Sequence, residues 1–182
     1  VFEMNYGFPP NETQALINIG ASMINIDIIA DGVLQFTRDI SMGGALLTEE
    51  IQREMGVSYE EAEHYKTGTG EVMSSSAILR EVERLSENFV GPLVAEIQRS
   101  IEFFKATSIF SDLSKIYLCG GSCQIPALVP LLEQKLVIPV ELINPFKNIM
   151  IDTKRFDVGL LQESASSAAV AVGLSLRRRG DK

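Results

Sequence analysis

The sequence predicts an α/β protein in which helices flank a mixed sheet and a smaller helical lobe is inserted. Three observations support this fold class. Apolar and polar residues alternate between residues 13 and 40, as is typical of half-buried strands. From residue 77 to residue 104 the apolar spacing changes to three and four, which indicates a long amphipathic helix. Strand-like runs then return near residues 116–119 and 140–143.

The composition is ordinary for a soluble globular protein, with 46% apolar and 22% charged residues in a chain of 182. A net charge of −8 argues against nucleic acid or anionic lipid as a partner bound through charge. The apolar stretch at residues 168–176 is far shorter than the ~20 residues that cross a bilayer, so direct membrane insertion is not expected. Because Val1 is not a start methionine, we expect a piece of a longer protein.

The first part of the chain predicts a short helix and three antiparallel strands. The helix lies within residues 1–8 and ends at Gly7. The predicted strands are residues 13–19, 23–30 and 33–40. Asp31-Gly32 between the last two is the dipeptide most typical of a two-residue hairpin turn.

Residues 45–106 predict the inserted helical lobe. Its first helix is expected to begin with Thr48 as the N-cap and to end at Gly56. Ser58 and Glu61 have the spacing of a capping box, which predicts the start of a second helix.

The long helical tract and the elements after it complete the predicted fold. Gly91-Pro92 predicts a kink or a short break near Phe89. Pro130 moves the expected start of the following helix toward Val129. The later elements are a strand ending at Cys119, a helix at 126–135, a strand at 140–143 and a helix at 157–177 that is rich in Ala and Ser.

Two turns of small residues are the candidate binding residues. Gly20, Ala21 and Ser22 follow the first strand, and successive backbone N–H groups in such a turn can bind an anion such as phosphate. Gly120-Gly121-Ser122 follows a later strand and precedes a helix opened near Pro126, where a ring or phosphate can approach the backbone. The first turn alone is compatible with an ordinary hairpin, but a second turn of the same kind stands later in the chain.

Catalytic residues and metal ligands are not predicted. Cys119 and Cys123 are four residues apart and the single His64 is remote in sequence, so a buried reduced pair is favoured over a zinc site. The same three residues give no convincing pair of nucleophile and base.

In this order the two turns resemble the second phosphate motif and the adenosine motif of the actin-like (ribonuclease H-like) ATP-binding superfamily. The stretches INIGAS, FTRDISMGG, LTEEIQR and LCGGSCQIP resemble the PilM family of type IV pilus assembly, which is related to the cell-division protein FtsA. The likeness covers nearly all 182 residues. It implies the second half of an actin-like molecule, with subdomain 2A at residues 1–44 and 107–182 and subdomain 2B at residues 45–106.

The resemblance also implies roles for the residues of the turns. The amides of Gly20, Ala21 and Ser22 would face the β and γ phosphates of ATP, and the Ser22 hydroxyl would be a further donor. Mg²⁺ would be held mainly through water. The residues implied to contact adenine and ribose are Gly120, Gly121, Ser122, Glu63 and Lys66. For Glu63 and Lys66 the alternative is an exposed ion pair on a helix surface.

Asn18 departs from the superfamily pattern, in which many members have Asp. An amide keeps the shape of the carboxylate but cannot accept a proton, so we expect at most slow ATP hydrolysis and a structural role for ATP. The alternatives are an FtsA-like or other polymerising actin-like ATPase and a sugar-kinase or acetate-kinase relative. The lack of an acidic base between Leu16 and Met23 argues against a kinase. The inserted lobe and the INIGAS stretch favour the pilus family over a filament protein, although self-association stays open.

The function implied is that of a scaffold that binds ATP between two halves and links to PilN at the inner membrane. This scaffold would be cytoplasmic and peripheral to that membrane. In the family the N-terminal peptide of PilN binds mainly to the first half, and other pilus assembly proteins are further partners. This chain alone is expected to bind ATP weakly or not at all, because each 1.4 kcal/mol of lost contact weakens binding about tenfold.

Overall fold

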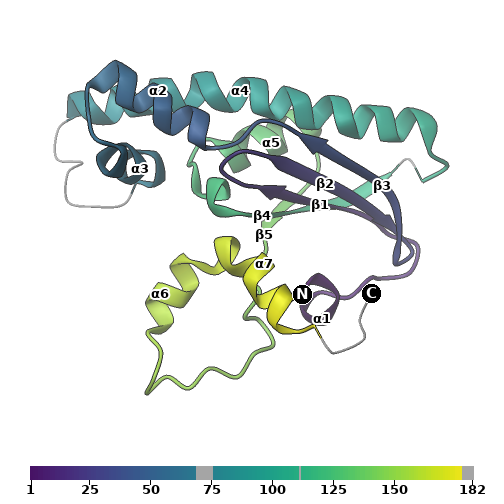
Figure 1. The fold of residues 1–182 in the computed structure, drawn as a ribbon. Helices are drawn as coiled ribbons and strands as arrows, with labels where there is room; N and C mark the ends of the chain where they lie inside the picture. Colours follow the sequence, from purple (N-terminus) through teal and green to yellow (C-terminus); the bar gives the residue numbers. More distant parts are fainter. Residues whose placement is uncertain (69–75, 111, 178–182) are drawn as a thin grey trace.

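The structure, a computed structural model, describes residues 1–68, 76–110 and 112–177. In this part of the chain five strands form one mixed sheet in the order β3-β2-β1-β4-β5 (Figure 1). The strands are β1 Thr13–Ile19, β2 Ile24–Ala30, β3 Val33–Ile40, β4 Leu113–Cys119 and β5 Val140–Leu142. β1, β2 and β3 are antiparallel neighbours, whereas β4 is parallel to both β1 and β5. The predicted mixed sheet is confirmed.

The strands of the first hairpins follow the alternation of apolar and polar side chains, as the sequence predicts. Ile24, Ile26 and Ile28 are fully buried, while the polar residues between them are only partly buried. Asp31 and Gly32 both have positive φ, 51° and 75°, which a two-residue turn of this hand requires. The predicted bounds of these three strands therefore agree with the structure to within one residue.

Helices lie on both sides of the sheet (Figure 1). They are α1 Phe2–Asn5, α2 Ala45–Met55, α3 Tyr59–Thr67, α4 Ser76–Thr107, α5 Leu128–Leu136, α6 Val158–Glu163 and α7 Ala165–Ser175, with a 3₁₀ turn η1 at Gly121–Gln124. Within the described ranges, every helix is too short or too polar to cross a membrane.

One large cluster of buried side chains joins the sheet to α2, α3, α4 and α5. Ile26 of β2, Leu47 of α2 and Ile97 of α4 are all fully buried in it. On the opposite face of the sheet a smaller cluster joins Phe2 of α1 and Ala169 of α7 to β4. The helices of residues 45–106 thus contribute to the same core as the sheet.

The start of α2 differs from the prediction. Thr48 does not cap this helix, because α2 begins at Ala45 and Thr48 lies within its first turn. The N–H groups of Gly44 and Ala45 donate to Gly20 O and Ala21 O, at 3.0 and 2.9 Å. The turn after β1 therefore accepts from two backbone donors at the start of this helix, one of which, Ala45 N–H, has no acceptor within the helix. The capping box of Ser58 and Glu61 is confirmed at the start of α3.

Of the kink or short break predicted near Phe89, the break is wrong, because α4 runs without interruption from Ser76 to Thr107. Pro92 lies on the exposed side of the helix, while Phe89 and Leu93 beside it are buried. A proline ring clashes with the backbone N–H and the Cβ of the preceding residue, and the second of these clashes is absent at Gly91, which has no Cβ. Burial of apolar side chains such as Phe89 and Leu93 thus stabilises the helix across Gly91-Pro92.

The helix predicted at 157–177 consists of two helices that meet at Ser164. The Ser164 hydroxyl donates to Leu160 O at 2.7 Å, and such back-bonding by serine competes with the helical backbone pattern. The helix expected near Val129 begins at Leu128, so Pro130 lies in its first turn, where no backbone N–H is needed.

Candidate functional site

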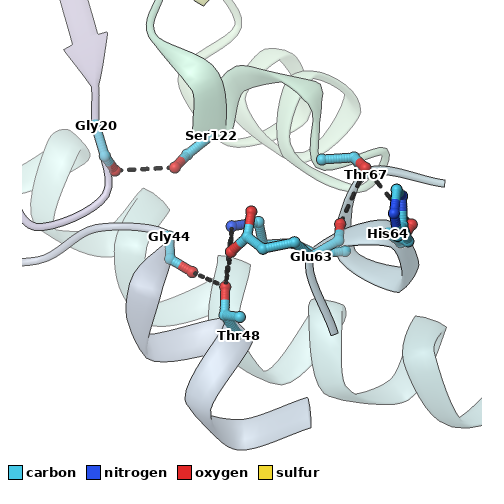
Figure 2. Close-up of polar contacts among 8 residues, drawn as sticks. Gly20, Gly44, Thr48, Glu63, His64, Thr67 and Ser122 are labelled. Carbon is cyan, nitrogen blue, oxygen red and sulfur yellow. Dashed lines mark hydrogen bonds and ion pairs between the residues drawn. The ribbon is translucent and has the colours of Figure 1, made fainter. Parts of the chain in front are cut away.

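The two predicted turns lie side by side. β1 and β4 are parallel neighbours, so the turns that follow them emerge at the same edge of the sheet. The Ser122 hydroxyl donates to Gly20 O at 2.9 Å (Figure 2). A Cβ on Gly120, whose φ is +99°, would lie 2.3 Å from Ile19 O. Gly120 is therefore required for close packing of the two strand ends.

A third turn, Gly43-Gly44, packs against the first two. A Cβ on Gly43 would lie 2.4 Å from Ala21 O, and one on Gly44 would lie 2.2 Å from Ser122 Oγ. In the sequence these glycines belong to the FTRDISMGG stretch that carries the family resemblance, but they are not among the predicted site residues. The paired glycines were the signal that could have placed them in the site.

Ala21 and Ser22 are the residues of the first turn that present free backbone donors. Gly20 N–H donates to Met23 O at 2.9 Å and so closes the hairpin. Ala21 and Ser22 are exposed, and no group in the described part of the chain accepts from their N–H groups. An anion at this turn would therefore meet the amides of Ala21 and Ser22 rather than that of Gly20.

Only one residue of the second turn faces open space. Gly120 is buried against β1, and Ser122 is 3% exposed with its hydroxyl on Gly20 O. Gly121 is exposed, and a Cβ added there would meet nothing within 4 Å. Gly121 is thus the position at which a flat ring could lie on the backbone.

Glu63 and Thr48 lie together beside these turns (Figure 2). Lys66 joins them in one hydrogen-bonded network. Lys66 Nζ donates to Glu63 Oε1 at 2.6 Å and to Thr48 Oγ1 at 2.9 Å. The Thr48 hydroxyl also lies within hydrogen-bond distance of Glu63 Oε1 and Gly44 O. Lys66 is only 6% exposed, so the alternative of an exposed ion pair is wrong for this residue.

The network sets the charge of Glu63. Partial burial alone would raise the pKa of this carboxyl, but hydrogen bonds from Lys66 and Thr48 and the charge of Lys66 outweigh that effect. The pKa of Glu63 is therefore below its ordinary value, and the carboxylate is ionised at neutral pH.

A cavity of about 140 Å³ adjoins Lys66 between α3, α4 and the start of α5. Its lining includes Tyr65, Lys66, Leu79, Val82, Pro126 and Ala127. Its volume is close to the roughly 150 Å³ of apolar cavities that accept a single aromatic ring such as benzene, but Lys66, Glu83 and Glu87 add charge to this lining. The space beside Lys66 therefore matches a ring rather than a whole nucleotide.

Asn18 lies on the other face of the sheet. Its Nδ2 donates to Asn25 Oδ1 at 3.0 Å, and Asn25 in turn donates to Asp39 at 2.7 Å. Asn18 also lines a separate cavity of about 190 Å³ together with Phe2 of α1 and Ala169 of α7. Asn18 is thus next to the turns in sequence but does not face the cavity beside Lys66.

The two cysteines are free thiols. Burial raises the pKa of Cys119 to about 11 and also raises that of Cys123. Cys123 Sγ donates to Cys119 O at 2.8 Å. Because the thiolate is the nucleophilic form, neither thiol is reactive at neutral pH.

Comparison with known proteins identifies the relatives of this arrangement. The family model described as "Type IV pilus assembly protein PilM" matches residues 7–179. A solved structure of the PilM-PilN type IV pilus biogenesis complex aligns over 92% of this chain and 46% of its own, with 27% identity and a TM-score of 0.78. This chain thus spans about half the length of that relative.

Two further solved structures share the fold at lower identity. The ethanolamine utilization protein EutJ from Carboxydothermus hydrogenoformans has 17% identity and a TM-score of 0.62, over 96% of this chain and 51% of its own. MreB5 of Spiroplasma citri bound to AMPPNP has 14% identity and a TM-score of 0.61, over 96% of this chain and 55% of its own. The fold is therefore actin-like.

Proposed function

Because this chain belongs to the PilM family of type IV pilus assembly proteins, we propose that it forms one half of an ATP-binding scaffold for pilus assembly. In this proposal a second actin-like half, of similar size, completes the molecule. Residues 1–44 and 107–182 are then subdomain 2A, and residues 45–106 are subdomain 2B.

The observation that carries the proposal is the meeting of three glycine turns beside a ring-sized cavity. The amides of Ala21 and Ser22 fit the phosphates of ATP, because they are exposed and without an acceptor in the described residues. Gly121 and Lys66 fit the adenosine, with Glu63 beside Lys66.

The relatives support the proposal of a bound nucleotide and of PilN as the partner. MreB5 and a MamK mutant are both described as bound to AMPPNP, an analogue of ATP. The pilus relative is described in complex with PilN. We propose ATP with water-held Mg²⁺ as the ligand of this protein, and PilN as the partner that brings it to the inner membrane.

The nucleotide is proposed to act as a structural ligand. Asn18 has no proton-accepting carboxylate, and its amide is engaged with Asn25. Phosphoryl transfer requires charge neutralisation and an oriented water molecule, and the other phosphate-binding loop would belong to the second half. Hydrolysis by this half alone is therefore not expected.

A charge placed at the first turn tests the ATP site. In the protein with both halves, Ser22→Asp is expected to weaken ATP binding tenfold or more, because it puts a carboxylate beside the phosphates. Ser22→Asn has nearly the same shape without the charge and is expected to keep the affinity within about threefold. Isothermal titration calorimetry measures both. Equal affinity for ATP in the two variants would refute the site.

A further inference from the structure

Strand β3 is an open edge of the sheet (Figure 1). In the described residues it pairs only with β2, so the backbone groups on its other side have no strand beside them. Such an edge is a template for pairing with a further strand, and natural edges are often protected by proline or lysine. β3 contains neither, and six of its eight residues are exposed. Its register with β2 shifts at Gln35, but residues 36–40 pair regularly.

Aromatic side chains of α4 lie beside this edge. The ring centroids of Phe103 and Phe104 are 6.2 and 5.9 Å from that of Phe36 in β3. Phe103 is nevertheless 56% exposed. A groove of about 330 Å³ between β3 and the end of α4 is lined by Phe36, Phe104 and Ile109, and Ile109 is 91% exposed. A strand added to β3 would therefore also cover apolar surface of α4.

Arg38 is an unneutralised charge on the same edge. It is exposed, and among the described residues it takes part in no ion pair. Arg38 and Phe36 lie on the same face of β3, since both are opposite buried isoleucines of β2. The edge thus presents a guanidinium and an aromatic ring two positions apart.

A second copy of β3 is complementary to this edge. In an antiparallel pair, directly opposite residues lie on the same face of the sheet and their side chains interact. If Thr37 is opposite Thr37 of the second copy, Phe36 of each copy is opposite Arg38 of the other. A guanidinium over an aromatic ring is a favourable contact. The register with Arg38 opposite itself would instead put two like charges together, which is unfavourable.

We propose that β3 pairs antiparallel with β3 of a second copy, about a two-fold axis at Thr37, and joins the two sheets into one. The contact is closed, because the same surface is used by both copies. Arg38 of each copy then lies over Phe36 of the other, beside the exposed Phe103. This dimer goes beyond the proposed scaffold function and does not rest on the ATP site.

Sedimentation velocity of the protein with both halves, over a range of concentrations, tests this dimer. Wild type is expected to pass from monomer to dimer as the concentration rises. Thr37→Lys puts two ammonium groups opposite each other at the axis, so the Kd of the dimer should rise tenfold or more. Thr37→Gln is polar but uncharged and should keep the Kd within about threefold. Because Thr37 is exposed, neither change is expected to disturb the fold.

Disulfide cross-linking tests the register. Opposite residues of an antiparallel pair have Cβ atoms about 4.5–5.5 Å apart, close enough for a disulfide after a small shift. Oxidation of Thr37→Cys should therefore give a covalent dimer. Asp39→Cys is the matched control, because it lies on the same face of β3 but opposite residue 35 of the second copy. It should form no more covalent dimer than wild type.

Three results would overturn this inference. One is a wild-type protein that stays monomeric up to about 1 mM. Another is a dimer whose Kd is the same in Thr37→Lys and Thr37→Gln, since the interface would then lie elsewhere. The third is cross-linking of Asp39→Cys as readily as of Thr37→Cys, which would exclude an axis at Thr37.

Discussion

Lys66 is the residue at which the glycine turns and the cavity are joined. Its ammonium is buried, and burial of a charge costs free energy unless the charge is paired and hydrogen-bonded. Glu63 and Thr48 provide both partners. The side chain of Glu63 is 34% exposed, against 7% for Lys66, so Glu63 is the member of the pair that solvent or a ligand reaches.

The charge of Glu63 makes stability depend on pH. We expect Glu63→Gln to lower the free energy of unfolding by about 1 kcal/mol near neutral pH, because the buried ammonium loses its counter-charge and solvent partly screens the pair. Since the folded pKa of Glu63 is below its ordinary value of 4.5, this stabilisation is present above about pH 4.5 and is lost as pH falls through the folded pKa.

Urea unfolding between about pH 7 and about pH 3 measures this difference. Glu49→Gln, at an exposed position of α2 and in no ion pair of the described residues, is the control, and it should change stability little at any pH. A difference between wild type and Glu63→Gln that stays constant over the whole range would contradict the role of the Glu63 charge.

At the scale of elements, α4 is stable in spite of a proline in its interior. Residues on both sides of Pro92, among them Phe89, Val90, Leu93 and Val94, are buried in the main core. Pro92 itself has no N–H to donate to Asn88 O, one turn earlier. The helix therefore lacks one backbone hydrogen bond, and burial of the neighbouring apolar side chains outweighs the free energy lost with it.

Replacement of Pro92 should stabilise the protein. Pro92→Ala restores the N–H and removes the ring at an exposed position, so we expect a gain of about 1–3 kcal/mol. Thermal unfolding measures it, at about 2–4 °C per kcal/mol for a chain of this size. The exposed Asn88→Ala on the same helix changes only helix propensity and should gain no more than about 0.7 kcal/mol. A Pro92→Ala protein no more stable than the Asn88→Ala control would mean that the proline is required by its surroundings.

The elements also show what the sequence could predict. The hairpins of β1, β2 and β3 follow from local alternation and from Asp31-Gly32, so their bounds were predictable. The start of α2 was not predictable, because the N–H groups of Gly44 and Ala45 find acceptors at Gly20 and Ala21, in a turn 24 residues earlier in the chain. The same holds for the intact α4, whose continuity depends on burial against distant strands.

At the scale of the whole molecule, the site required tertiary contacts that no local pattern contains. The sequence indicated the two turns, and the parallel pairing of β1 with β4 brings them together. It did not indicate Gly43-Gly44, the engaged amide of Gly20 or the burial of Ser122, because each depends on contact between separate segments. Which turn residues are exposed to a ligand and which are buried in contacts between the turns is therefore determined only by the folded chain.

A ligand that joins two halves should stabilise the complete protein without being consumed. For the protein with both halves we expect ATP and AMPPNP to raise the free energy of unfolding equally, by about 2.7 kcal/mol at a hundredfold excess over Kd. This chain alone should respond far less, because it has only part of the contacts. Thermal unfolding with each nucleotide, together with a phosphate-release assay, measures both effects. Brisk magnesium-dependent release of phosphate would contradict the structural role, since Asn18 has no carboxylate to accept a proton.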